Sequence, residues 1–405
     1  MTPDSSRNIR FVARSDQGGK PDGVQFMLHR SGYGFVGQTY AEGVSILDLR
    51  DPKHPAPAGF IAMPPNTRAS HIQLADDLLL VVNGPNPAKA QASAEYFTRA
   101  LADTQRRDLP FSAGMRIYDV ARPTAPREIA FLPVEGLGIH RMWYVGGRHA
   151  YVSAHFDGFA DHILAIVDMA DPERPGFVGR WWMPGMWRAG GETPTWKGRY
   201  ALHHALVAND LAYGAWRDGG LTIHDVSEPA NPKLIVHRNW SPPFGGGTHS
   251  PLPLPDRNLL VLGDEATADN GADGVKCVWI FDVREPANPV SIATMPRPDE
   301  ADYNAKGAKF GPHNLHENRP GSFRSSSLIF ATWYNAGVRV FDIADPFRPR
   351  EAGHFVPAAP ERMIPEQSAR PRVIQSCDVH VDTRGLLYVT DTNAGLTILE
   401  YDGPK

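Results

Sequence analysis

Histidine recurs at one position of a repeated strand pattern, and imidazole can bind a metal ion or transfer a proton near neutral pH. When the first strand of each repeat is aligned by the polar turn that follows it, six repeats place histidine at the same position: His71, His140, His204, His249, His313 and His380. Gln25 occupies that position in the first repeat. Only 16 of the 405 residues are histidine, about one in 25, so this recurrence indicates a shared role.

A set of neutral imidazoles suits iron, copper, zinc or nickel better than magnesium or calcium. We expect three or four of these seven side chains to bind one divalent metal ion, with iron or copper favoured and manganese or zinc as alternatives. The others would orient the ligands or hydrogen-bond the substrate. Two other interpretations stay open, namely a polar structural ring and a metal-free acid–base site.

The strands that would carry these histidines belong to a repeat. Six segments alternate apolar residues, end in Asp and continue into a proline-flanked turn, as in "LAIVDMADPERP" at 164–175, and a seventh stops at the chain end. Their acidic anchors are Asp48, Asp119, Asp168, Asp225, Asp282, Asp342 and Glu400, at successive gaps of 71, 49, 57, 57, 60 and 58 residues. An Asp at a turn accepts hydrogen bonds from nearby backbone N–H groups. We therefore interpret these carboxylates as structural.

Alternation with period two indicates half-buried strands, and a period near 57 with almost no helical pattern indicates β-propeller blades. We predict an all-β fold, a single seven-bladed β-propeller domain over residues 1–405. The last repeat ends after its third strand, whereas 8–14, "NIRFVAR", reads as an unpaired outer strand. Pairing these two segments would close the ring and protect both sheet edges.

The segment "LAIVD" at 164–168, the clearest copy of the Asp-bearing strand, resembles the LVIVD-repeat proteins. The resemblance extends through all seven repeats and implies the propeller fold. It implies no reaction, because that family is defined by its repeat.

The innermost strands of a propeller line its axial channel. We therefore expect the aligned residues to form an inward ring, with His204 facing the channel and His203 facing away by strand alternation. The insertion at 84–113 belongs to the same side. Its good helix formers and an apolar stripe predict a helical lid over the site, with the stripe at Ala90, Ala94, Phe97 and Leu101.

Aromatic residues in the connections on that side are expected to form an apolar vestibule that binds the substrate: Trp187, Trp216, Phe244, Tyr303 and Phe310, with Trp196 and Trp240 beside them. The candidate catalytic residues are His155, Arg217, Glu265, His316 and Asp378. Among them, His316 is expected to shuttle a proton and Asp378 to orient a ligand.

Bulk composition excludes several functions. The formal net charge of −4 gives no reason to expect nucleic acid or an anionic membrane as a partner, and no segment has the length of a membrane span. Two cysteines, Cys277 and Cys377, give no disulfide framework, and the N-terminal residues lack a signal peptide. We expect a cytoplasmic protein.

The predicted function is that of a metal-dependent enzyme acting on a small, partly aromatic or apolar molecule. An oxidoreductase that activates oxygen is favoured, by analogy with the four-histidine iron site of carotenoid-cleaving oxygenases. A lyase or hydrolase that uses manganese or zinc as a Lewis acid is the alternative, because Gln25 in the ring resembles the three His and one Gln of oligogalacturonate lyases. A non-catalytic interaction scaffold is a further alternative, and the oligomeric state stays open.

Overall fold

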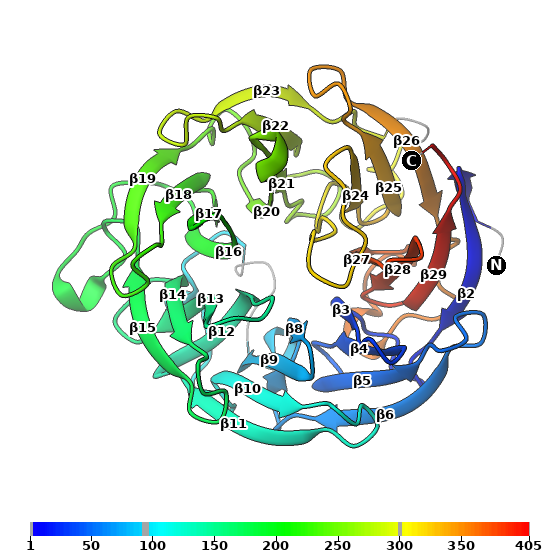
Figure 1. Ribbon diagram of the computed structural model, residues 1–405, viewed down its shortest axis with the longest axis horizontal. Helices are drawn as coiled ribbons and strands as arrows, with labels where there is room; N and C mark the ends of the chain where they lie inside the picture. The colour runs from blue at the N-terminus through cyan, green and yellow to red at the C-terminus, as the bar shows by residue number, and fades with distance from the viewer. Residues whose placement is uncertain (1–2, 91–96, 299–301, 405) are drawn as a thin grey trace.

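The computed structural model describes residues 3–90, 97–298 and 302–404. Antiparallel strands follow one another around a central axis, as Figure 1 shows. The first sheets in chain order are β3 (Gln25–Leu28), β4 (Tyr33–Gly37), β5 (Gly43–Asp48) and β6 (Ala56–Ala62); then β7 (Thr67–Arg68), β8 (Ile72–Ala75), β9 (Leu78–Pro85), β10 (Gly114–Asp119) and β11 (Arg127–Pro133); then β12 (Gly136–Trp143), β13 (His149–Phe156), β14 (Ile163–Asp168) and β15 (Gly176–Trp181).

An eight-stranded sheet follows, in which the pair Arg217 and Thr248 joins two such units. Its strands are β16 (Tyr200–Ala208), β17 (Leu211–Arg217), β18 (Leu221–Asp225), β19 (Lys233–Arg238), β20 (Thr248–Leu254), β21 (Leu259–Asp264), β22 (Val278–Asp282) and β23 (Val290–Thr294). In the next sheet, Leu315 bridges to Ala331 on the inner side of β24 (Leu328–Thr332), β25 (Val338–Asp342) and β26 (Arg350–Val356).

The ring closes as the sequence predicts. The strand β2 (Ile9–Ser15) pairs with β29 (Gly395–Tyr401), and the same sheet continues to β28 (Leu386–Asp391) and β27 (Ser376–Val381). A short strand that the sequence did not predict, β1 (Ser5–Arg7), covers the edge of β26 in the neighbouring sheet. These contacts protect strand edges that would otherwise be exposed.

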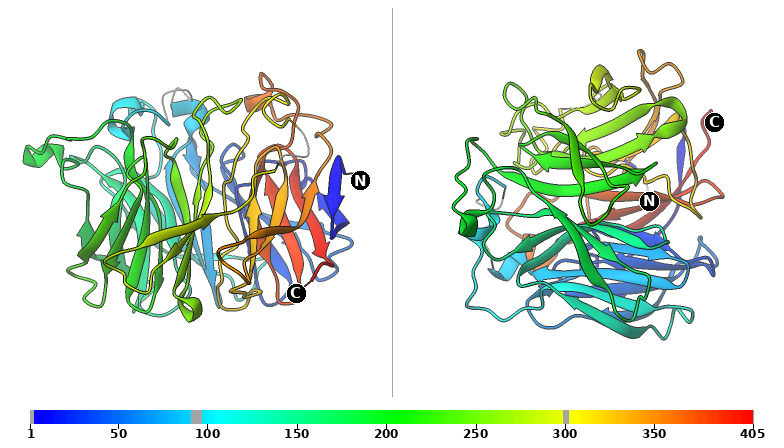
Figure 2. Two further views of the ribbon diagram at one scale, coloured as in Figure 1. Left: turned by 90° about the horizontal axis from the view of Figure 1, so that it is seen from above. Right: turned by 60° about the vertical axis from the view of Figure 1, so that its left-hand side comes forward.

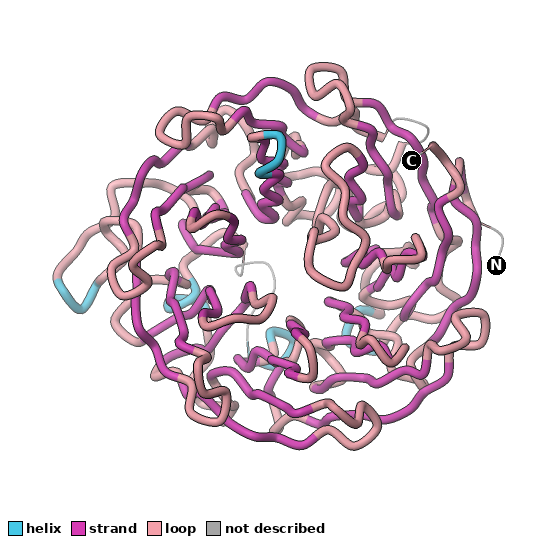
Figure 3. The backbone as a smooth tube through the Cα atoms, viewed as in Figure 1, coloured by secondary structure: helices cyan, strands magenta, loops and turns pink. Residues whose placement is uncertain are grey.

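The Asp anchors are structural, as expected. In six repeats the Asp Oδ1 accepts a hydrogen bond from the backbone N–H two residues later, for example Asp168 from Ala170 at 2.9 Å and Asp342 from Ala344 at 2.8 Å. These turns lie in loops that connect the strands. Apolar clusters fill the spaces between neighbouring sheets, and the sheets surround the central axis (Figures 2 and 3).

Helices are short in the described part of the chain: α1 (Pro87–Ala90), α3 (Leu101–Thr104) and the 3-10 turns η1 (Arg188–Gly190), η2 (Pro255–Arg257) and η3 (Pro365–Gln367). The single helix expected through the 84–113 insertion is interrupted, because Phe97–Ala100 lie outside helix, and Ala94 of the predicted stripe lies outside the described residues. None of the helices described is long and apolar enough to cross a membrane.

Candidate functional site

Most inner strands contain a β-bulge near their first residues. In β12, β20 and β27 the pairing register shifts at a single extra residue, namely His140, His249 and Cys377. A bulge leaves one residue unpaired and re-aims its side chain, and bulges are common beside functional sites. Gly138 precedes the bulge of His140 with φ +84°, and its missing Cβ lets the chain pass the Asn83 carbonyl.

The same bulge occurs at His71, His203 and His313. Three residues that include His71 oppose two residues of β9, and His203 falls in the register shift before His204. His313 and Asn314 both bond to Thr332, so two residues oppose one. The histidine position, which the sequence alignment located only approximately, therefore corresponds to the bulge residue of the inner strand.

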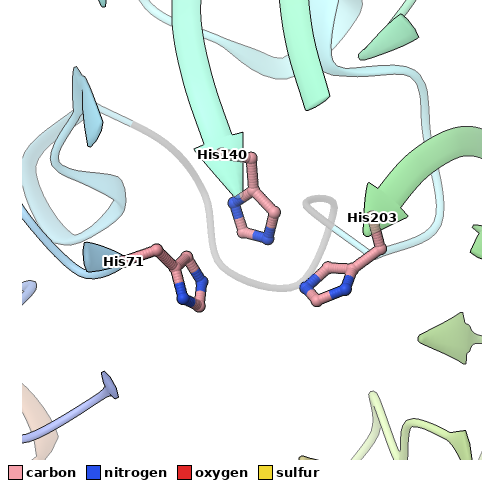
Figure 4. A group of neighbouring side chains, drawn as sticks. All are labelled: His71, His140 and His203. Carbon is pink, nitrogen blue, oxygen red and sulfur yellow. The ribbon is translucent and has the colours of Figure 1, made fainter. Parts of the chain in front are cut away.

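Five of these residues form a continuous arc of imidazoles, which we call the histidine arc: His71, His140, His203, His249 and His313. Successive ring centroids lie 5.0, 4.8, 3.5 and 4.6 Å apart. In His71, His140 and His203, one ring nitrogen of each lies within 4.8 Å of the others. Figure 4 shows these three rings, each from a different sheet, turned toward a common centre.

Backbone carbonyls fix the tautomers of part of the arc. Nδ1 of His203 donates to the His249 carbonyl at 2.9 Å, Nδ1 of His249 lies 3.1 Å from the His313 carbonyl, and Nδ1 of His313 donates to the Cys377 carbonyl at 2.5 Å. A carbonyl can only accept, so Nδ1 carries the proton and Nε2 keeps its lone pair. Metal-binding histidines in proteins make the same contact.

Arg141 holds two other imidazoles in the opposite tautomer. Its guanidinium lies 3.2 Å from Nδ1 of both His71 and His204, and arginine can only donate. Nε2 of His204 donates to the Met142 carbonyl at 3.2 Å, so both nitrogens of His204 are bonded. Nε2 of His71 carries the proton of the neutral ring.

His140 is the imidazole of the arc whose two nitrogens both lack partners. Both are buried and make no hydrogen bond with the described residues. Beside it lies His162, at 5.4 Å between centroids, with Nδ1 donating to Asp161 at 2.9 Å and a buried, unbonded Nε2. Burial lowers the pKa of His140 well below its ordinary value and that of His162 to about 4. The cluster therefore consists of neutral imidazoles.

Glu265 forms a second group at the other end of the arc. It accepts a short hydrogen bond from Arg217 and one of 2.7 Å from the Tyr334 hydroxyl, and Nζ of Lys309 lies 3.5 Å away. Nε2 of His249 and of His313 lie 3.4 and 3.8 Å from its oxygens. The positive neighbours outweigh burial and hold the pKa of Glu265 well below its ordinary range, so it is ionised.

Two of the residues that bond Glu265 have a left-handed backbone, Arg217 at φ +52° and Tyr334 at φ +40°. Non-glycine residues in this region carry local strain, which is common in functional sites. The Phe97 ring of the insertion lies 4.1 Å from Lys309 Nζ and 5.9 Å from the Arg217 guanidinium carbon. Leu101 N of α3 donates to Asp161 at 2.8 Å. The insertion thus contacts the group around Glu265 and the Asp161 carboxylate, and its role as a lid stays a prediction.

The adjacent pair His203 and His204 is assigned the wrong way round by the sequence. His203 belongs to the arc, and His204 bonds Arg141 and Met142 instead. Strict strand alternation fails here because the bulge turns His203 inward.

His380 and Gln25 also lie outside the arc. His380 packs against His316 and Phe26 and lines a pocket of about 710 Å³ formed mainly by turns between inner and second strands. Cys377, three residues earlier, takes the bulge position in its strand. Gln25 accepts a hydrogen bond from Ile72 N at 3.0 Å, and its strand pairs without a bulge. Counting from the following turn fails where turn and strand lengths differ.

The catalytic candidates divide into two sets. Arg217 and Glu265 face the arc, whereas His316 bonds the Phe323 carbonyl and Val381 N through its two nitrogens. That bonding leaves His316 no free nitrogen to shuttle a proton. Asp378 accepts from Phe26 N at 3.1 Å, with its pKa raised to about 6 by burial, and bonds no arc histidine. His155 accepts from Leu137 N at 3.3 Å and lies 6.3 Å from His162.

Of the predicted aromatic vestibule, Trp216, Tyr303 and Phe310 are buried, whereas Trp187 and Phe244 are exposed and their contact with a substrate stays a prediction. Trp216 is fully buried in an apolar cluster, and Tyr303 and Phe310 stack on each other at 5.4 Å within another. Trp187 packs with Trp182 and Phe159, Phe244 and Trp240 pack with Trp279, and Trp196 stacks on Tyr200. The aromatic side chains next to the site are Phe97 and Tyr334, which the sequence analysis did not assign to the substrate.

The sequence analysis also missed His162, Lys309, Tyr334 and Arg68. "DH" at 161–162 was a usable signal, because a carboxylate next to a histidine often orients it. The other three carry no repeat pattern that would have marked them.

Comparisons with known proteins agree with the fold. The LVIVD repeat model matches residues 206–238, and no curated protein matches the chain. The structure is similar to the β-propeller domain of Cps50 (Swd1) from Myceliophteria thermophila, with a TM-score of 0.58, 9% identity and coverage of 97% of this chain and 99% of that one.

Two further solved structures are similar. Virginiamycin B lyase from Staphylococcus aureus has a TM-score of 0.54 at 11% identity, covering 98% of this chain and 99% of that chain. A putative 6-phosphogluconolactonase from Bacteroides fragilis has a TM-score of 0.52 at 11% identity, covering 94% of each. At such identities the likeness shows the fold alone, so this chain is a β-propeller that contains an LVIVD repeat.

Proposed function

We propose that this propeller, which we interpret as seven-bladed, is a metal-dependent enzyme with a metal site on His71, His140 and His203. The observation that carries the proposal is His140, whose two buried ring nitrogens have no partner among the described residues and which lies between two other imidazoles. Burying polar nitrogen without a partner costs free energy. A bound cation would accept the one lone pair of the neutral ring.

The three residues fit such an ion after small side-chain rotations. Their nitrogens lie within 4.8 Å of one another, whereas two nitrogens on one tetrahedral ion at about 2.1 Å are about 3.4 Å apart. His203 presents the required Nε2 lone pair, and His71 would present one only after its proton moves from Nε2 to Nδ1, which ends the hydrogen bond from Arg141. Three neutral nitrogen donors favour iron or copper over manganese or zinc.

With iron or copper bound, the site supplies redox chemistry, and we favour an oxidoreductase acting on a small organic molecule. His162, held by Asp161, keeps an Nε2 acceptor beside His140 that can take a proton from the substrate. Phe97 and α3 restrict water at the opening. The Tyr334 hydroxyl, bonded to Glu265, is a proton donor on the opposite side.

A metal-dependent lyase or hydrolase is the second candidate. The group formed by Glu265, Tyr334 and Lys309 beside His249 favours it, because these residues supply the acid and base that proton abstraction and elimination need. We propose a cytoplasmic location because Cys277 and Cys377 are both free and buried.

The test is the metal content of untagged protein, measured by inductively coupled plasma mass spectrometry after anaerobic reconstitution with Fe(II), copper, zinc and manganese separately. We expect about one ion per chain, lost in His140→Ala and His203→Ala. His204→Ala and His380→Ala are matched controls, because the sequence nominated both and the structure places neither in the arc.

If His203→Ala keeps the metal, or if folded His380→Ala loses it, the ion does not bind at His71, His140 and His203. Absence of any bound metal after all four reconstitutions would overturn the proposal. Iron or copper would support the oxidoreductase, and manganese or zinc the lyase or hydrolase.

A further inference from the structure

Arg68 is a buried cation beside the histidine arc. It ends β7 opposite Gly84, three residues before His71, and is 5% exposed. Its Nε is buried and has no hydrogen-bond partner, and within residues 3–90, 97–298 and 302–404 no carboxylate pairs with its guanidinium. An unpaired buried charge is costly to maintain.

Every other buried arginine among the described residues has a carboxylate partner. Arg141 and Arg319 share Glu317, Arg199 bonds Asp161, Arg217 bonds Glu265 and Arg339 bonds Glu351. Arg68 is the exception, and it lies three residues before the arc histidine His71. The exception indicates a partner that is not part of the described chain.

The charge of Arg68 reaches the proposed metal site. Arg68 ends β7, whose partner strand β9 packs against β12, the strand that carries His140. Across the arc, Glu265 is shared by two cations, Arg217 and Lys309. The site therefore carries an excess of positive charge around neutral imidazoles, and a metal ion would add to it.

We propose that the substrate is a small carboxylate whose carboxylate group is bound by the guanidinium of Arg68, with the adjacent carbon directed toward His71, His140 and His203. The guanidinium presents paired N–H groups that match one carboxylate. Phosphate sites usually add a cluster of backbone N–H donors or a helix N-terminus, whereas the described helix nearest in sequence to Gly84, the partner of Arg68, is the four-residue α1. That the bound anion is a substrate rests on the proposed function; that an anion binds does not.

The test is isothermal titration calorimetry with acetate, propionate and benzoate, each against its own amide, and with phenyl phosphate, at constant ionic strength. Wild type and Arg68→Gln are compared with and without metal. Arg116→Gln is the matched control, because Arg116 lies in the same sheet but is paired with Glu128 and Asn83.

We expect a carboxylate to bind at least tenfold more tightly than its amide to wild type and Arg116→Gln, and this preference to vanish in Arg68→Gln. The melting temperature of ligand-free Arg68→Gln should not fall, because the substitution removes an unpaired charge. A structural role would lower it.

Equal binding of carboxylates and amides to wild type, or an unchanged preference in Arg68→Gln, would overturn the proposal. Tighter binding of phenyl phosphate than of benzoate would overturn the carboxylate assignment. A preference that depends on Arg68 in protein that takes up no metal would preserve the anion site and refute the metal-dependent function, so the two failures are distinguishable.

Discussion

Two buried polar regions of the molecule, the group around Glu317 and the surroundings of the histidine arc, each include a buried arginine. They differ in how completely their polar groups are hydrogen-bonded. Around Glu317, Arg319 donates to Gln73 at 2.6 Å and to the carbonyls of Leu74 and Tyr144, at 2.5 and 3.0 Å. Arg141 donates to Glu317 at 3.0 Å. Near His71, by contrast, Arg68 and His140 keep buried nitrogens without partners.

This difference separates a structural polar network from a binding site. Buried polar groups in native proteins are almost always satisfied, and each exception calls for an explanation. The Glu317 group satisfies itself and ties inner strands of different sheets together. In the arc and beside it, buried nitrogens of Arg68, His140 and His162 have no partner among the described residues, which is the pattern on which we base the proposed site.

The largest effect is expected from comparing Arg319→Gln with Arg68→Gln. Removing Arg319 leaves two buried carbonyls and part of the Glu317 charge unpaired, so we expect a loss of about 3–5 kcal/mol in the free energy of unfolding. Arg68→Gln should lose none. Urea denaturation followed by circular dichroism measures both. Equal losses would mean that the two arginines play the same structural role.

Glu265→Gln distinguishes the two histidine clusters. The substitution leaves Arg217 and Lys309 with a neutral partner, and we expect a loss of about 3 kcal/mol in stability. Metal content should not change, because the proposed ion lies on His71, His140 and His203 and not on His249 and His313. Loss of the metal from folded Glu265→Gln would instead place the ion beside Glu265. Measuring the metal content of the folded Glu265→Gln protein and of the unfolded protein separately, by mass spectrometry, decides between these two positions of the ion.

The smallest effect concerns His224, whose two nitrogens are also buried and unbonded but which contacts Trp181 away from any other histidine. Burial lowers its pKa from 6.5 to about 3. Below pH 6.5 the unfolded chain binds a proton that the folded protein does not, so stability is full above pH 6.5 and falls as the pH drops toward 3.

Relative to His224→Leu, wild type should therefore lose up to about 1.4 kcal/mol per pH unit below pH 6.5. Thermal melts of both proteins from pH 7.5 to 4.5 measure the difference. A pH-independent difference would show that folding does not change the pKa of His224. The comparison matters for the arc, because His224 is a single unbonded imidazole against Trp181, whereas the unbonded His140 lies between two other imidazoles.

Much of the fold was predictable from local chemistry. The Asp anchors Asp168 and Asp342 bond the turns as expected, and the strand at Ile9–Ser15 closes the ring on β29. The turns depend on residues close in sequence. The closure of the ring depends on the regular spacing of the repeat, which shows that the last repeat lacks one strand. The candidate site was predicted in part: His71, His140, His249 and His313 lie in the arc, and Arg217 and Glu265 face it.

The sequence by itself determined the repeated strands, their turns and the enrichment of histidine where the inner strands begin. The tertiary structure alone decided that His203 and not His204 faces the arc, and that Cys377 and not His380 holds the bulge. A single inserted residue reverses which side chain points inward, and strand alternation gives no sign of it. Which polar groups stay unpaired, Arg68 and His140 above all, depends on contacts between sheets distant in sequence.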